Sequence, residues 1–189
     1  MLRIYTREVE ELKQKIENGT ARDCYAVRFL EDPETKELGH TQTLFALGSM
    51  LEAGSDTTRV AIAHALAAAA TDPRWVATAR EKLDEVCGRN GERLPTFADR
   101  PQLPYITAVA KEAVRWRPQP ELGVPRVLTR DDEYEGYRFP AGTVFTWNAW
   151  HITLNSEEYE EAERFWPERF LNEHLNEPLN GHWNFGVGE

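Results

Sequence analysis

The sequence is short of cysteine, of basic charge and of long apolar runs. Its two cysteines, Cys24 and Cys87, are far apart and have no Cys-x-x-Cys or Cys/His spacing, so neither a metal site nor a disulfide framework is indicated. The formal net charge of −10 argues against a nucleic-acid partner, because binding phosphate backbones requires clustered lysine and arginine. No stretch reaches the roughly 18 uninterrupted apolar residues of a membrane-spanning helix, and the N-terminus lacks the apolar core of a signal peptide.

What the sequence does contain is typical of a globular domain. The 189 residues are 41% hydrophobic and 29% charged, which is enough for one substantial core. No repeat, low-complexity tract or linker separates a second domain, so residues 1–189 are expected to belong to one domain. The acidic balance is most simply a solvated surface.

Helical patterns dominate the first half. Apolar residues at helical spacing predict a helix from about Thr6 to Gly19 and a second, short helix around Tyr25 to Leu30, followed by a polar loop. Residues 41–71 lack proline and are rich in alanine and leucine, which predicts one helix of roughly 30 residues. Its apolar residues surround much of the circumference, so we expect it to run through the middle of a domain.

The second half mixes helices with short strands. Asp72 and Pro73 predict the start of a helix that Gly88 closes, and Pro104 begins another helix that ends before Pro118. The residues expected on the buried face of that second helix are Ile106, Val109, Ala110, Ala113 and Val114. Residues 122–150 predict short strands and a hairpin, residues 156–163 a polar helix, and the last part is expected to be irregular. The predicted fold class is mainly α with a small β region.

Residues 53–58 place a glycine, a carboxylate and two hydroxyls inside the long apolar helix. Glycine weakens a helix by about 1 kcal/mol relative to alanine, and threonine hydroxyls can bond backwards to carbonyls and bend it. The segment is therefore either a polar niche that admits water or a solvated stripe. The hexapeptide by itself favours neither.

Glu112 and Arg115 are spaced so that their side chains meet on one helix face. An exposed pair of this kind contributes only about 0.3–0.5 kcal/mol and is common, so a surface bridge is the default interpretation. A second arginine, Arg169, lies in Pro-Glu-Arg-Phe and could complete a buried Arg–Glu–Arg cluster. The chain ends with Phe-Gly-Val-Gly-Glu, whose two glycines allow the backbone to approach a flat cofactor closely.

Taken in order, the motifs AGSDTT, KEAVR, PERF and FGVGE resemble those of the cytochrome P450 family, the haem-thiolate monooxygenases. The resemblance covers essentially the whole chain and is firmest from about Thr41 onward. It implies a partial cytochrome P450 fold built around the long central helix.

The resemblance assigns roles to individual residues. Asp56 and Thr57 match the pair that delivers protons to iron-bound oxygen, and Glu112, Arg115 and Arg169 match a buried structural triad. Leu122 to Val124 would line the substrate pocket. The residues implied to contact the haem are Ala53, Gly54, Arg126, Phe185 and Gly188, with Arg126 facing a haem propionate.

The chain departs from the family pattern at the iron ligand. The family's loop continues to a cysteine that would lie just past Glu189, and neither Cys24 nor Cys87 has a matching context. His182 is close in sequence but is expected to be an exposed loop histidine. We therefore expect a single incomplete domain that lacks the N-terminal part, the haem cysteine loop and the final helix.

The resemblance implies an oxidoreductase that inserts one oxygen atom from dioxygen into an organic substrate, with haem as cofactor and electrons from a reductase. Without the axial cysteine, the isolated chain is expected to be inactive. The alternative is a non-catalytic truncated product that binds haem weakly or only a protein partner. Membrane attachment would occur only through a missing N-terminal segment. An endoplasmic reticulum location is compatible with the family, and substrate and compartment stay open.

Overall fold

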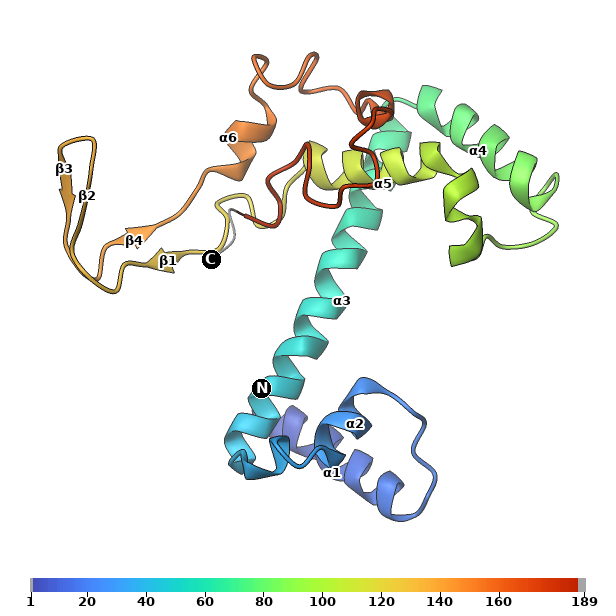
Figure 1. Cartoon of the computed structure of the whole chain (residues 1–189). Coiled ribbons are helices and arrows are strands. Elements are labelled where there is room, and N and C mark those ends of the chain that lie inside the picture. Colours follow the sequence, from blue (N-terminus) through green and yellow to red (C-terminus); the bar gives the residue numbers. More distant parts are fainter. Residues whose placement is uncertain (1, 187–189) are drawn as a thin grey trace. The chain divides into compact units, whose positions relative to one another are not determined.

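A computed structural model describes residues 2–186 and divides them into two compact units, which meet in sequence between Thr58 and Arg59 (Figure 1). The long helix α3, His40–Thr71, runs from the first unit into the second along the chain. The secondary structure is mainly helical with four short strands among the described residues, as predicted from the sequence. No helix in residues 2–186 is long and apolar enough to cross a membrane.

The first unit contains α1 (Leu2–Glu17), α2 (Tyr25–Glu31), a 3-10 turn (Thr35–Glu37) and the first part of α3. Its core consists of Tyr5, Val9 and Leu44. Gly48 of α3 lies against the Tyr5 ring, where any added Cβ would overlap the ring atoms. Glycine at this position therefore lets α1 pack closely on α3, and the Tyr5 hydroxyl donates a hydrogen bond to Glu52 one turn further along.

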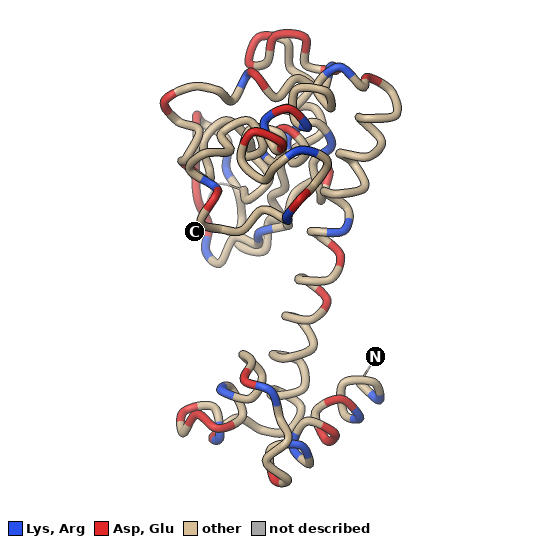
Figure 2. The backbone as a smooth tube through the Cα atoms, turned by 90° about the vertical axis from the view of Figure 1, so that its right-hand side faces the viewer, with Lys and Arg blue, Asp and Glu red and all other residues tan. Residues whose placement is uncertain are grey.

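The predicted long helix is confirmed over His40–Thr71. It is uninterrupted, and its only acidic or basic residues other than histidine are Glu52, Asp56 and Arg59, which is why the helix carries few coloured bands in Figure 2. Alanine and leucine supply the helix propensity. The helix buries Leu44, Gly48 and Ala68 near its two ends, whereas residues 49–59 between them are exposed.

The second unit begins with the end of α3 and continues into α4 (Arg74–Cys87), a 3-10 turn (Phe97–Gln102) and α5 (Pro104–Trp116). The predicted boundaries are confirmed, with Asp72 accepting a hydrogen bond from the Arg74 N–H at 3.2 Å and Gly88 ending α4 at a φ of 86°. The core residues come from distant parts of the chain and are Ala68, Ala113, Trp116 and Phe165.

The predicted buried face of α5 is confirmed only in part, since Val109 packs against the core and Val114 is half-buried. Ala113 is buried, but Ala110 is exposed and Ile106 is half-buried. The face turned inward instead includes Lys111, Glu112 and Arg115. Periodicity of apolar residues fails here because these charged side chains have buried partners on another segment.

The strands form two small antiparallel pairs. β1 (Arg126–Val127) pairs with β4 (Val144–Phe145), and β2 (Asp132–Tyr134) pairs with β3 (Tyr137–Phe139). The predicted hairpin is the β2–β3 pair, whose turn has positive φ at Glu135 (50°) and Gly136 (81°). Two central residues with positive φ form the turn whose twist matches that of antiparallel strands.

The predicted helix over residues 156–163 is wrong, because these residues form consecutive turns after a shorter helix, α6 (Ala149–Thr153). The backbone carbonyls of Glu160 and Ala162 accept hydrogen bonds from arginine side chains, and the Glu161 carbonyl accepts one from Arg169 as well as one from the Arg164 N–H three positions on. Long-range side-chain donors have thus replaced the local helical ladder. A last 3-10 turn, η3 (Pro167–Phe170), contains the Pro-Glu-Arg-Phe segment.

Candidate active-site framework

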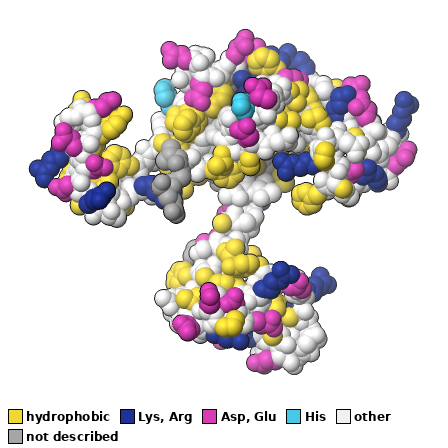
Figure 3. Space-filling view, in the orientation of Figure 1, with side chains coloured by type: hydrophobic (Ala, Val, Ile, Leu, Met, Phe, Trp, Pro, Cys, Tyr) yellow, Lys and Arg dark blue, Asp and Glu magenta, His cyan; other side chains and the backbone are white. Residues whose placement is uncertain are grey.

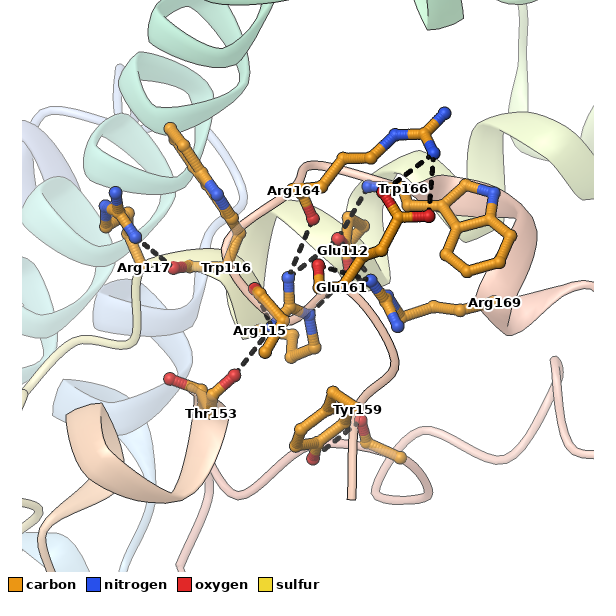
Figure 4. Close-up of polar contacts among 12 residues, drawn as sticks. Glu112, Arg115, Trp116, Arg117, Thr153, Tyr159, Glu161, Arg164, Trp166 and Arg169 are labelled. Atoms are coloured by element: carbon orange, nitrogen blue, oxygen red, sulfur yellow. Dashed lines mark hydrogen bonds and ion pairs between the residues drawn. The ribbon is translucent and has the colours of Figure 1, made fainter. Parts of the chain in front are cut away.

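The central feature of the second unit is an ion pair that is fully buried on α5. Arg115 Nε donates to Glu112 Oε2 at 2.7 Å, and Arg115 Nη2 donates to Glu112 Oε1 at 2.8 Å (Figure 4). Both side chains have an exposed fraction of 0%. The parallel pair of hydrogen bonds uses the planar guanidinium fork, which a lysine could not reproduce.

The remaining donors of Arg115 reach backbone carbonyls about forty to fifty positions away. Nη1 donates to Thr153 O at 2.7 Å and to Ala162 O at 3.0 Å, and Nη2 donates to Arg164 O at 3.3 Å. The guanidinium carbon also lies 5.2 Å from the centre of the Tyr159 ring. Desolvation of this cation is therefore offset by several polar partners at once.

Arg169, which lies in η3, contacts the same Glu112 carboxylate. Its Nε lies 3.3 Å from Glu112 Oε2, and its Nη1 donates to Glu160 O at 2.9 Å. The Trp166 N–H completes the set by donating to Glu112 Oε1 at 2.7 Å. Burial lowers the pKa of the Arg169 guanidinium, and the nearby Glu112 carboxylate acts in the opposite direction. The structure thus brings Glu112, Arg115 and Arg169 together in one buried cluster, which fastens α5 to residues 153–169.

Lys111 is a buried cation that the sequence analysis missed. Its Nζ donates to the carbonyl oxygens of His174, Leu175 and Glu177 at 3.1, 3.4 and 2.8 Å, and it lies 5.4 Å from the centre of the Phe170 ring. Burial lowers the pKa of this ammonium. The available signal was its spacing of four positions from Arg115, which places the two side chains on one face of a helix.

Residues 53–57, which contain the candidate proton-delivery pair, lie in the first unit. Ala53, Gly54, Asp56 and Thr57 are all exposed on an unbroken helix. The Thr57 hydroxyl donates to Ala53 O at 3.0 Å, which is the backward bond expected of a helical threonine. A Cβ added at Gly54 would meet no atom within 4 Å, so the helix flank there is open.

Arg126 lies in β1 opposite Phe145 and is exposed. The apolar residues around it also reach the surface of the β region (Figure 3), including Leu122, Val124 and Val127. An exposed apolar surface with an arginine among it suits the edge of a flat, largely apolar group that carries carboxylates.

The start of the glycine-rich segment differs from expectation at His182. Phe185 is exposed, whereas His182 is buried rather than exposed, with ring centres 5.6 Å apart. Burial lowers the pKa of the His182 imidazole. The interpretation of His182 as an exposed loop histidine is therefore wrong, because the ring packs inside the turns that follow η3. Gly188 lies outside the described residues.

The profile of the family described as Cytochrome P450 matches residues 3–189. The chain belongs to the cytochrome P450 family. Among curated relatives, it is 37% identical to cytochrome P450 monooxygenase verL of Clonostachys rogersoniana, covering 98% of this chain and 36% of that protein. It is 38% identical to cytochrome P450 monooxygenase 113 of Postia placenta, covering 91% of this chain and 34% of that protein. The chain therefore spans about a third of the length of these P450 relatives.

Solved P450 structures agree with this assignment. A zebra fish cytochrome P450 described with progesterone has a TM-score of 0.78 at 26% identity, over 99% of this chain and 44% of that one. A second zebra fish cytochrome P450 structure, described with abiraterone, has a TM-score of 0.69 at 29% identity and covers 80% of this chain. The fold is thus that of the P450 family, whose cofactor is haem.

In the first unit, the open helix flank at Gly54 leaves room for a flat group. In the second unit, considered by itself, the exposed apolar surface around Arg126 has the chemistry that the edge of a haem group would need. Within residues 2–186, no cluster of three or more His, Cys, Asp or Glu is arranged as a metal site. Cys24 is exposed at the start of α2, and Cys87 is buried at the end of α4.

Proposed function

We propose that this chain is the part of a haem-thiolate monooxygenase that carries the proton-delivery helix, the structural cluster and the beginning of the haem loop. The observation that carries the proposal is the family match over residues 3–189, together with the burial of Glu112, Arg115 and Arg169 in one cluster. The complete protein would insert one oxygen atom from dioxygen into an organic substrate, using electrons from a reductase. The two zebra fish structures, described with progesterone and abiraterone, support an organic substrate class.

Bound haem supplies the activation of dioxygen, and the chain supplies orientation and protons. Ala53 and Gly54 would lie against the haem face, Arg126 would pair with a propionate, and Phe185 and Gly188 would belong to the start of the haem-binding loop. Leu122 to Val124 would border the substrate. The iron ligand would be the cysteine that the family places just past Glu189.

Asp56 and Thr57 would move protons. Asp56 is exposed on the helix surface, where a carboxylate can exchange protons with water. Thr57 donates its own hydroxyl hydrogen to Ala53 O, which leaves the oxygen lone pairs able to accept a hydrogen bond from water. A carboxylate next to a hydroxyl held in this way is a short route for protons along α3.

The test uses the full-length protein that carries this sequence. Replacing Asp56 by Asn should slow product formation while the reduced, carbon-monoxide-bound spectrum stays of the thiolate type. Thr71 of the same helix also donates backwards, to Ala67 O at 3.2 Å, so Thr71→Val is a matched control for Thr57→Val. Unchanged turnover in both the Asp56 and the Thr57 variant would contradict the relay.

We further propose that the 189-residue chain by itself is inactive, because neither of its cysteines lies in the glycine-rich segment. The reduced, carbon-monoxide-bound spectrum of the isolated chain should lack the thiolate signature. A thiolate-type spectrum would overturn this proposal.

A second candidate is a non-catalytic product that binds haem weakly or only a protein partner. The exposure of large apolar side chains favours it, since Leu94 and Phe97 are 86% and 96% exposed. Limited proteolysis separates the two candidates for the isolated chain. A stable partner-binding protein should resist cleavage, whereas an enzyme fragment should be cut at many sites.

A further inference from the structure

Two glycines from distant segments lie against the same tryptophan. A Cβ added at Gly123 would overlap the bond shared by the two rings of Trp147, and a Cβ added at Gly186 would come within 2.7 Å of Cη2 on the outer edge of that indole. Both glycines have positive φ, 64° and 73°. Trp147 therefore occupies space that any side chain at either glycine would need.

Hydrogen bonds join the same three segments. The Gln119 N–H donates to Asn184 Oδ1 at 3.2 Å, and the Trp150 N–H donates to Glu121 O at 3.0 Å. The Thr146 hydroxyl also donates to Leu122 O. These hydrogen bonds connect three segments, residues 119–123, 146–150 and 184–186. The Trp147 indole of the second segment contacts both of the others.

The shape of the indole, rather than its N–H, holds this arrangement. Trp147 Nε1 is buried and has no hydrogen-bond partner within the described residues 2–186. A buried donor without a partner is unfavourable, so a tryptophan at this position is explained by the packing of its ring against the two glycines.

We propose that Trp147 is a positioning residue that sets the turn ending at Gly186, where the haem loop begins, against residues 119–123, which precede Arg126. The packing stands on the contacts described above, and its effect on haem rests on the proposed function. Replacing the ring should shift the beginning of the haem loop relative to the strand that carries Arg126.

The test is a double-mutant cycle in the full-length protein, with Gly186→Ala and Trp147→Leu made singly and together. Gly142→Ala is the matched control, because Gly142 has a φ of 87° but a Cβ there would meet nothing within 4 Å. Both alanine variants carry backbone strain, and only Gly186→Ala also collides with the indole. Gly186→Ala should lower the folding equilibrium constant about tenfold more than Gly142→Ala. This excess should disappear in the Trp147→Leu background and persist in part with Trp147→Phe.

A spectroscopic measurement separates positioning from simple stabilisation. Trp147→Leu should shift the Soret maximum and weaken haem retention, and Trp147→Phe should restore both in part. Equal effects of Gly186→Ala and Gly142→Ala in both backgrounds would overturn the packing. If the double-mutant cycle shows the expected coupling between Gly186 and Trp147 but Trp147→Leu leaves the haem spectrum unchanged, the positioning role is overturned. Absence of a thiolate spectrum in the unmodified full-length protein would instead refute the proposed function. The double-mutant cycle would still test the contact between Gly186 and Trp147.

Discussion

The ammonium of Lys111 lies 2.8 Å from the carbonyl oxygen of Glu177, although 66 positions separate the two residues. Two more carbonyls, those of His174 and Leu175, converge on the same ammonium. One cation therefore organises the backbone of the turns that lead from η3 to the glycine-rich segment. A lysine used in this way has no solvent-exposed function and is needed for its charge and its reach.

Replacing Lys111 by Met keeps an unbranched side chain that is one heavy atom shorter and removes the three ammonium donors. The carbonyls left behind lose their partner, so the free energy of unfolding should fall by about 1–3 kcal/mol. Protease cleavage within residues 172–180 should appear before cleavage elsewhere in the second unit. Lys82→Met is the control, because the Lys82 side chain is 40% exposed and forms its ion pair with Glu85, three positions along the same helix. Equal cleavage of both variants would contradict this role for Lys111.

Replacing Glu112 by Ala leaves Arg115 buried and Arg169 without its carboxylate. Removing one partner of a buried ion cluster costs about 3–5 kcal/mol, so little soluble, folded protein is expected. Glu85→Ala is a matched control, because Glu85 also pairs with a cation three positions away but is exposed, and its loss should cost about 0.5 kcal/mol or less. Urea unfolding measures both, and a stable Glu112→Ala protein would show that the cluster is dispensable.

His182 should make stability fall in mildly acidic solution. Burial lowers its pKa in the folded state below the ordinary value of 6.5, so below that pH the unfolded chain binds a proton that the folded chain does not. Stability is then lost as the pH falls from 6.5 towards the lowered pKa, with a slope of at most about 1.4 kcal/mol per pH unit. His182→Gln should reduce this slope between pH 7.5 and 5.5, where burial also lowers the pKa of His64 and the hydrogen bond with Glu177 raises the pKa of His174.

The control for the histidine prediction is His151→Gln, since His151 is exposed. Denaturant unfolding at each pH gives the comparison. The His151→Gln substitution should leave the slope of stability against pH unchanged. An unchanged slope in His182→Gln would contradict the prediction.

Features governed by local sequence could be predicted. The long helix follows from an alanine- and leucine-rich stretch without proline, and the end of α4 follows from Gly88. Helical spacing alone made a surface bridge the default interpretation for Glu112 and Arg115. The resemblance to the P450 motifs implied that these two residues and Arg169 form one buried cluster.

Features governed by long-range contacts could not be predicted. Residues 156–163 have helical composition, but their carbonyls bond to Arg115 and Arg169. The inward face of α5 is charged because partners arrive from residues 153–177, and His182 is buried by its neighbours in the folded turns. Apolar periodicity carries no information about partners so distant in sequence. The proton-relay and haem-contact roles of Asp56, Thr57, Ala53, Gly54 and Arg126 stay predictions.

The separation between Arg115 and its carbonyl partners has a consequence for the order of events during synthesis. The partner carbonyls of Thr153 and Arg164 follow Arg115 by 38 and 49 residues, so α5 leaves the ribosome well before they exist. Until then the guanidinium stays hydrated, and its pairing must bear the entropy of closing a long loop. The docking of residues 153–169 on α5 is therefore expected to be a late, cooperative step, and a nascent chain halted between these points would expose α5 to chaperones.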